Sequence, residues 1–136
     1  MLFFNDATTF QGAFNHSAAQ IRTAQLTEEM AQAFYRREPE TIDHLAAQGA
    51  KFTREMLHAS VGFRDHHLAD KCLKAGVTPD EDMVKAAVNH KDAPLTSMLI
   101  HRITPSVQLK KYIEDYATDA VKKAAAPALQ HTAPEP

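Results

Sequence analysis

Apolar and small residues recur along this chain with a constant period. In one column of equivalent positions, Met30, Leu57 and Val84 follow one another at a 27-residue spacing. Four more columns keep the spacing: Ala33, Ser60 and Ala87; Leu45, Cys72 and Leu99; Ala46, Leu73 and Ile100; and Thr41, Leu68 and Leu95. A fixed period of this length is typical of repeat proteins, whose units bury their apolar faces against one another.

Each unit contains a doublet of a basic and an acidic residue, which predicts the boundary between two helices. The doublets are Arg37-Glu38, Arg64-Asp65 and Lys91-Asp92, with Asp119 one further step along. The acidic residue is expected to cap the second helix, since carboxylates accept hydrogen bonds from the free N–H groups of a helix start. Pro39 and Pro94 follow closely, where a first-turn residue has no N–H partner to lose.

The outer ends of each unit are also marked. Thr27, Thr53 and Thr78, the last followed by Pro79, predict the N-caps of the first helices. Glycine is expected to end the second helix, because the residue after a helix often needs a positive φ angle. Gly49 and Gly76 occupy this position and keep the same spacing as the apolar columns.

These markers predict one helical repeat domain over residues 1–126. Its expected parts are a capping half-repeat at 8–21, repeats at 22–48, 49–75 and 76–102, and a C-terminal cap at 103–126. Lys122 and Lys123 replace apolar residues in the last part, as expected for a polar cap. A disordered tail is expected at 127–136, which has three prolines and little apolar surface to bury.

Part of the pattern is similar to a known family. Leu57-His58-Ala59-Ser60-Val61, followed by Leu68 to Gly76, resembles an ankyrin repeat, and Ala86 to Asn89 leading to Met98 to Ile100 is similar. The resemblance covers about residues 22–103, although the period is 27 rather than the usual 33. It implies an all-α solenoid of stacked helix-turn-helix repeats with reduced or absent hairpin loops, and a role as a protein-binding scaffold.

Composition and charge argue against several other classes of protein. The net charge is −2, from 15 basic and 17 acidic residues, so the basic excess of a general nucleic-acid binder is missing. No apolar stretch approaches the roughly 18 residues of a membrane span. Residues 1–6 lack the basic region of a signal peptide. We therefore expect a cytoplasmic protein, unless a dedicated secretion system exports it.

Residues that could carry chemistry have simpler structural interpretations. His66 and His67 are adjacent, with His58 and Asp65 nearby, but no His-x-x-x-His or Cys-x-x-Cys spacing supports a metal site. Cys72 shares a column with leucines, so a buried and unreactive thiol is expected. No phosphate-binding loop or nucleophile elbow is present. We predict no enzyme activity, no catalytic residue, no metal and no cofactor.

The leading prediction is a protein–protein interaction module: an adaptor, an inhibitor or a bacterial effector-type scaffold. The ankyrin-like alignment implies that the outward faces of the first helices bind the partner. The predicted binding residues are Gln32, Tyr35, Arg36, His58, Phe63, Lys85, Asn89 and His90. Tyr35 and Phe63 could instead pack between units.

Two alternatives stay open at this stage. One is a small-ligand-binding or metal-binding helical accessory domain of an enzyme system. The other is a structural homodimer that buries Phe3, Phe4 and Phe10 against a second copy.

Overall fold

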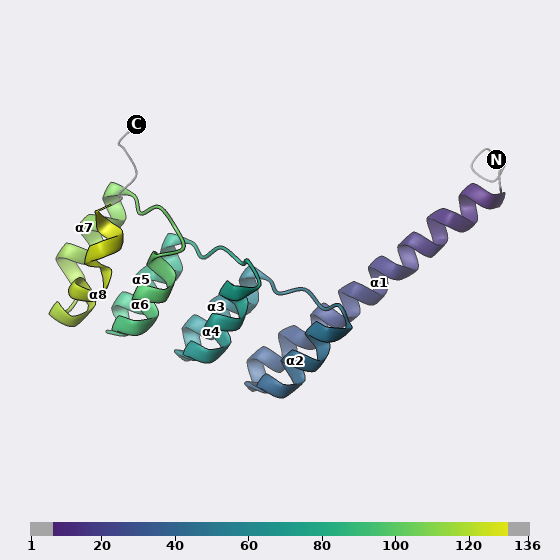
Figure 1. Cartoon of the computed structure of the whole chain (residues 1–136), viewed down its shortest axis with the longest axis horizontal. Helices are drawn as coiled ribbons and strands as arrows, with labels where there is room; N and C mark the ends of the chain where they lie inside the picture. The colour runs from purple at the N-terminus through teal and green to yellow at the C-terminus, as the bar shows by residue number, and fades with distance from the viewer. Residues whose placement is uncertain (1–6, 131–136) are drawn as a thin grey trace. The chain divides into compact units, whose positions relative to one another are not determined.

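The computed structural model describes the backbone of residues 7–130 and the side chains of residues 18–130. Within this range the chain is helical and contains no strand, as predicted (Figure 1). The eight helices are α1 (Ala7–Arg36), α2 (Pro39–Gln48), α3 (Arg54–Phe63), α4 (His66–Lys74), α5 (Glu81–Asn89), α6 (Ala93–Ile100), α7 (Val107–Tyr116) and α8 (Asp119–Leu129). None of the helices in this range is both long enough and apolar enough to cross a membrane.

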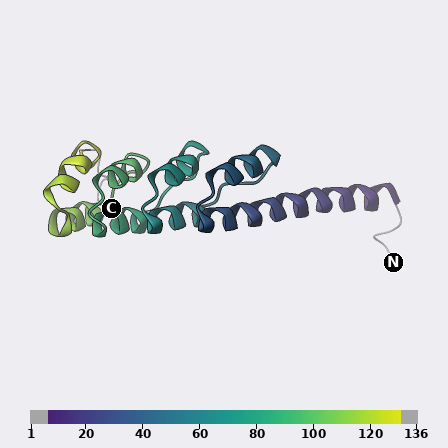
Figure 2. The ribbon, with the colours of Figure 1, turned by 90° about the horizontal axis from the view of Figure 1, so that it is seen from below.

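The chain divides into two compact units, Met1–Lys51 and Phe52–Pro136. The first unit contains α1 and α2, which pack against each other. In the second unit, α3 packs on α4, α5 on α6 and α7 on α8. Helix α5 also contacts α3 and α7, while α6 contacts α4 and α8. The second unit therefore has two helical layers, α3–α5–α7 and α4–α6–α8, which Figure 2 shows from below.

The turn inside a helix pair has the same backbone geometry in α1–α2, α3–α4 and α5–α6. Its basic residue, which is Arg37, Arg64 or Lys91, has a left-handed conformation with φ of 57°, 56° and 60° respectively. The N–H of the next residue then bonds the carbonyl five residues back, as in Asp65 to Ser60 at 3.0 Å. This bond closes a Schellman motif, which satisfies carbonyls at the end of the first helix.

The acidic residue of the doublet caps the second helix in two of the three turns, as predicted. Asp65 accepts a hydrogen bond from the Leu68 N–H, and Asp92 accepts one from the Leu95 N–H, both at 3.1 Å. Glu38 occupies the same position before α2 but makes no capping bond through its side chain. In α7–α8 the cap is Thr118, which accepts from the Val121 N–H, and Asp119 is the first helical residue.

Glycine ends the second helices α2 and α4 in the predicted way. Gly49 has φ of 113° and Gly76 has φ of 97°, values that only glycine adopts without strain. The following residue, Ala50 or Val77, donates its N–H to the carbonyl five residues back at 3.1 Å. The chain therefore leaves both helices along the same path.

The core consists of the columns that the sequence predicted. Their members are buried in every unit except at the first unit's Thr41 and Ala46, where the side chain is exposed and half-buried, respectively. Cys72, Leu73 and Leu99 have at most 1% of their surface exposed. The buried Ser60 hydroxyl donates to the Met56 carbonyl at 2.9 Å, so this small polar residue does not leave an unsatisfied group in the core.

Polar contacts also join successive helix pairs in the second unit. The Glu81 carboxylate accepts two hydrogen bonds from Ser106, from its N–H at 2.9 Å and from its hydroxyl at 2.7 Å. Ser106 in turn caps α7 by accepting from the Leu109 N–H. The Arg102 guanidinium donates at 3.2 Å to the Leu73 carbonyl in the last turn of α4, which also accepts from the Gly76 N–H at 3.0 Å.

Two predicted boundaries near the N-terminus are wrong. The expected half-repeat at 8–21 and the first helix of the first repeat form one continuous helix, α1, of 30 residues. Thr27 lies inside this helix and does not cap it. Its hydroxyl oxygen instead accepts a hydrogen bond from the Lys51 N–H at 3.0 Å, which fixes the segment that leaves α2.

Two later boundaries also differ from the prediction. The cap of α5 is Asp80, which accepts from the Met83 N–H at 2.9 Å, and Thr78 lies two residues before it. Helix α8 continues through Pro127 to Leu129, so the expected disordered tail does not begin at residue 127. Ala128, one residue later, is buried, and its packing favours the extra helical turn.

Candidate functional site

The predicted binding residues of the second unit lie on the outward side of the layer α3–α5–α7. Leu57, Ser60 and Val61 are buried, which leaves His58 and Phe63 on the other side of α3. His58 is exposed, and Phe63 keeps 38% of its surface exposed although its side chain is large and apolar. This arrangement follows from the spacing of the buried residues along the helix.

Helix α5 contributes a second part of this surface. Met83, Val84, Ala87 and Val88 are buried, and Lys85, Asn89 and His90 lie outside that buried set. Asn89 is exposed, while Lys85 and His90 are half-buried. The structure thus places all five predicted residues of the second unit at least partly at the surface.

Tyr112 on α7 links the predicted residues of α5 to a part of the surface that the sequence analysis missed. Its hydroxyl donates a hydrogen bond to the Asn89 side-chain oxygen at 2.7 Å. The Lys85 ammonium lies 5.3 Å from the centre of its ring, within range of a cation–π interaction. These two contacts hold the half-buried Tyr112 ring in place between the helices.

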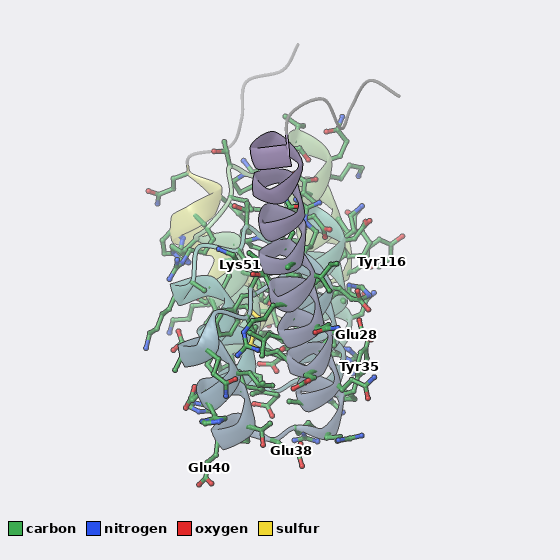
Figure 3. All side chains as sticks on the ribbon, turned by 90° about the vertical axis from the view of Figure 1, so that its right-hand side faces the viewer. Glu28, Tyr35, Glu38, Glu40, Lys51 and Tyr116 are labelled. Carbon is green, nitrogen blue, oxygen red and sulfur yellow. The ribbon has the colours of Figure 1, made fainter. Side chains whose placement is uncertain are left out.

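Tyr116 extends the aromatic surface by one helical turn. Its ring centre lies 4.7 Å from that of Tyr112, with the planes inclined at 46°. With 68% of its surface exposed, it projects outward from its helix, as the label in Figure 3 shows. We name Phe63, Lys85, Asn89, Tyr112 and Tyr116 the aromatic face.

A signal for Tyr112 and Tyr116 was present in the sequence. The step from the cap Asp80 to the cap Ser106 is 26, one less than the period of the earlier units. With this shift, Tyr112 aligns with Ala86, and Tyr116 aligns with His90. An alignment with a strict period of 27 misses both equivalences, because it pairs each residue of α7 with the neighbour of its true equivalent in α5.

The other three predicted binding residues, Gln32, Tyr35 and Arg36, belong to the first unit. Tyr35 and Arg36 are exposed on α1, with 54% of the Tyr35 surface exposed, and Gln32 is at the surface as well. Gln32 and Arg36 line a hollow of about 570 Å³ between α1 and α2. Figure 3 shows Tyr35 and the acidic Glu28 and Glu38 projecting from this unit.

Among residues 18–130, the histidines have structural contacts or lie wholly or partly at the surface. The His66 Nε2–H donates to the Asp92 carboxylate at 2.7 Å, so this side chain links the start of α4 to the cap of α6. Among the residues whose side chains are described, no three histidine, cysteine or acidic side chains are grouped so that they could hold a metal ion. His67, next to His66, lies at the surface.

Cys72 is buried in the core, as predicted from its column. Burial raises the pKa of its thiol from 9.0 to about 12, although a hydrogen bond with Ser60 opposes the increase. The thiol therefore stays protonated at neutral pH and lacks the thiolate that nucleophilic chemistry requires.

The N-terminal aromatic residues Phe3 and Phe4 lie outside the described residues, and the Phe10 side chain is also outside them. The predicted homodimer through these side chains stays a prediction. No family model, no curated protein and no solved structure matches this chain.

Proposed function

We propose that this chain is a protein–protein interaction module that binds a partner protein through the aromatic face. The observation that carries the proposal is the exposed Tyr116 ring beside a Tyr112 ring that is already held by Asn89 and Lys85. Tyrosine is enriched among the residues that contribute most to protein interfaces. A side chain that is fixed before binding loses less conformational entropy when the partner arrives.

The resemblance to ankyrin repeats supports the same role. We propose that the helix pairs form a solenoid related to ankyrin repeats in which the connections contain no hairpins. Such a surface is long and ridged, and it suits a protein partner better than a small substrate, which usually binds in a closed pocket. An adaptor, an inhibitor and a bacterial effector would all use it in this way, without catalysing a reaction.

The proposal is tested by capturing partners from the native source with the full chain and repeating the capture with a Tyr116→Ala variant. Isothermal titration calorimetry with the identified partner then gives the dissociation constant. A contact of about 2 kcal/mol, typical of an interface hot spot, weakens binding about 30-fold. Tyr112→Phe, which removes only the hydroxyl that bonds Asn89, should weaken binding less.

Ile21→Ala is the matched control, because Ile21 is a large apolar residue of similar exposure that lies on α1 and is not part of the aromatic face. It should bind like the parent chain. If Tyr116→Ala also binds like the parent while its helical signal is unchanged, the aromatic face is not the binding site.

A further inference from the structure

The two terminal helix pairs carry polar residues at positions that the helix pair α5–α6 buries. The caps of α7 and α8, Ser106 and Thr118, each follow the corresponding cap of α5 or α6 by the same 26-residue step. In this register, exposed residues of α7–α8 replace buried residues of α5–α6: Lys110 replaces Val84, Glu114 replaces Val88, Lys122 replaces Thr96 and Ala126 replaces Ile100.

The burial pattern shows which side of α7 these residues occupy. Helix α7 contacts α5, and no helix pair follows α7–α8 in the part of the chain that the structure describes. Leu109 and Ile113 are buried and therefore lie on the side of α5. Lys110 and Glu114 are exposed and lie on the side where a following pair would pack. We name the surface formed by Lys110, Glu114, Lys122 and Ala126 the C-terminal end face.

The first unit shows the opposite pattern. Glu29 and Thr41, which correspond to the buried Met83 and Leu95 at twice the 27-residue spacing, are exposed. Their neighbours Met30 and Ile42 are completely buried. The polar side of α1–α2 thus corresponds to the side on which α5–α6 packs against the pair before it, α3–α4. We name this surface, formed by Glu28, Glu29, Arg36, Glu38 and Thr41, the N-terminal end face.

The two end faces have opposite charge. The hollow of about 570 Å³ on the N-terminal end face is lined by Glu28, Glu29 and Glu38 against one arginine, Arg36. The hollow of about 310 Å³ on the C-terminal end face is lined by Lys110 and Lys122 against one glutamate, Glu114. Two of the charges, on Lys110 and Glu114, also lie near opposite charges along the helices when the register of successive pairs is applied.

We propose that the C-terminal end face of one copy of this chain docks on the N-terminal end face of a second copy, head to tail. In the register that relates successive pairs, Lys110 falls beside the level of Glu29, and Glu114 falls within two positions of the level of Arg36. Each contact then joins opposite charges, and Glu29, Lys110 and Glu114 occupy positions at which α5 buries apolar side chains. Because the two surfaces differ, the contact is heterologous, and each added copy brings one surface of each kind to which a further copy can bind.

This proposal is independent of the proposed function, because the end faces share no residue with the aromatic face. Polar end faces also keep repeat proteins soluble as monomers. Docking between copies differs from solubility in one requirement. End faces that only keep the monomer soluble need not carry opposite charges at positions that would meet.

Sedimentation velocity of the full chain, from about 10 µM to about 1 mM, covers the range in which weak polar contacts associate. At about 50 mM salt the sedimentation coefficient should rise with concentration, since exposed charges are weakly screened. At about 500 mM salt the rise should disappear, since screening weakens exposed charge pairs at short range. Single-size monomers at every concentration in low salt would overturn the proposal.

Charge reversal locates the contact. The Lys110→Glu, Lys122→Glu double variant should stay monomeric in low salt, and so should Glu28→Lys, Glu29→Lys. An equimolar mixture of the two variants should associate again, because each then meets an end face of opposite charge. Circular dichroism of each variant confirms that its helices are intact.

The matched control is Lys111→Glu, Lys123→Glu, which makes the same charge change on the same two helices with residues that do not line the hollow. This control should associate like the parent chain. If it becomes monomeric to the same extent, or if the mixture of reversed variants does not associate, net charge rather than the end faces governs association and the proposal is wrong.

Discussion

The turns of α1–α2 and α5–α6 have the same backbone path but different side-chain support. In both, a basic residue at positive φ is followed by an acidic N-cap residue with nearly the same backbone angles. Asp92 caps α6 through its carboxylate, whereas Glu38 makes no side-chain capping bond to α2. One additional methylene group thus separates a capped turn from an uncapped one.

The equivalent core positions are also less buried in α1–α2 than in α5–α6. Leu95 and Leu99 of α6 are completely buried, whereas Thr41, the equivalent of Leu95, is exposed, and Leu45, the equivalent of Leu99, borders the hollow of the N-terminal end face. The backbone path of the turn is therefore the same in a helix pair that lacks the side-chain cap and part of the apolar contacts of α5–α6. The Schellman turn and the remaining core are sufficient for this path.

The largest expected difference between the two pairs concerns their equivalent leucines. Leu99→Ala should lower the free energy of unfolding by about 2–5 kcal/mol, the range for leucine in a closely packed core. Leu45→Ala should cost roughly half as much, because the open hollow beside it leaves fewer contacts to lose. Urea unfolding followed by circular dichroism measures both values. Equal losses would contradict the distinction between the two pairs.

Removal of the acidic N-cap residue should also have a different effect on the stability of the two helix pairs. Asp92→Ala removes the bonds to the Leu95 N–H and to His66, and should cost about 1–2 kcal/mol. Glu38→Ala removes no capping bond and should change the free energy of unfolding by much less. Thermal and urea unfolding of the two variants compare them directly. An equal loss in Glu38→Ala would mean that Glu38 supports α2 in another way.

Glu38→Asp should make the first turn resemble the other two. The backbone angles at Glu38, φ −110° and ψ 84°, are already close to those at Asp92, φ −99° and ψ 92°. A shorter carboxylate can then reach the free N–H groups of α2, and we expect a gain of about 0.5–1 kcal/mol. Asp92→Glu, the reverse exchange, should lose a similar amount. A loss of stability in Glu38→Asp would contradict the explanation based on side-chain length.

The smallest effect should come from the left-handed residues. Arg37→Gly and Arg64→Gly each relieve a strained φ angle, and part of that gain is offset by the greater freedom of glycine in the unfolded chain. We expect a net stabilisation of about 0.5 kcal/mol in each. Ala86→Gly, at a helical position, should instead lose about 1 kcal/mol. Unequal shifts at Arg37 and Arg64, measured by urea unfolding, would show that the two turns are not equivalent in energy.

Much of the fold was predictable because its signals are local and recur. Asp65, Asp92 and Thr53 cap helices where the period placed them, and Gly49 and Gly76 end helices at the predicted positions. Each of these residues acts through bonds to its own neighbours in the chain. A residue type combined with a fixed spacing is then sufficient to identify its role.

The errors arose where two local signals compete. Thr27 has the chemistry of a cap, but the residues from Ala18 to Gln25 contain no helix-breaking residue, so α1 continues through it. Thr78 and Asp80 both resemble caps, and the 27-residue distance from Thr53 favours Asp80. The period was the better guide in the second case.

The candidate site was predicted only in part for a related reason. The residues of α3 and α5 follow directly from the buried columns. Tyr112 and Tyr116 depend on the shortened step before α7, and the contact of Tyr112 with Asn89 joins side chains of two different helix pairs. Such a contact needs the three-dimensional arrangement of the helices, which one-dimensional spacing does not contain.

The recurring doublet turn also bears on how a chain of this kind can change its length. Because Arg64 and Lys91 have nearly the same φ and precede equivalent caps, a deletion of residues 65–91 would join Arg64 directly to Asp92. The new junction would again be a basic residue followed by an aspartate, and the buried positions would keep their 27-residue spacing. Gene duplication or loss of one 27-codon segment could therefore add or remove a helix pair without creating a new type of turn.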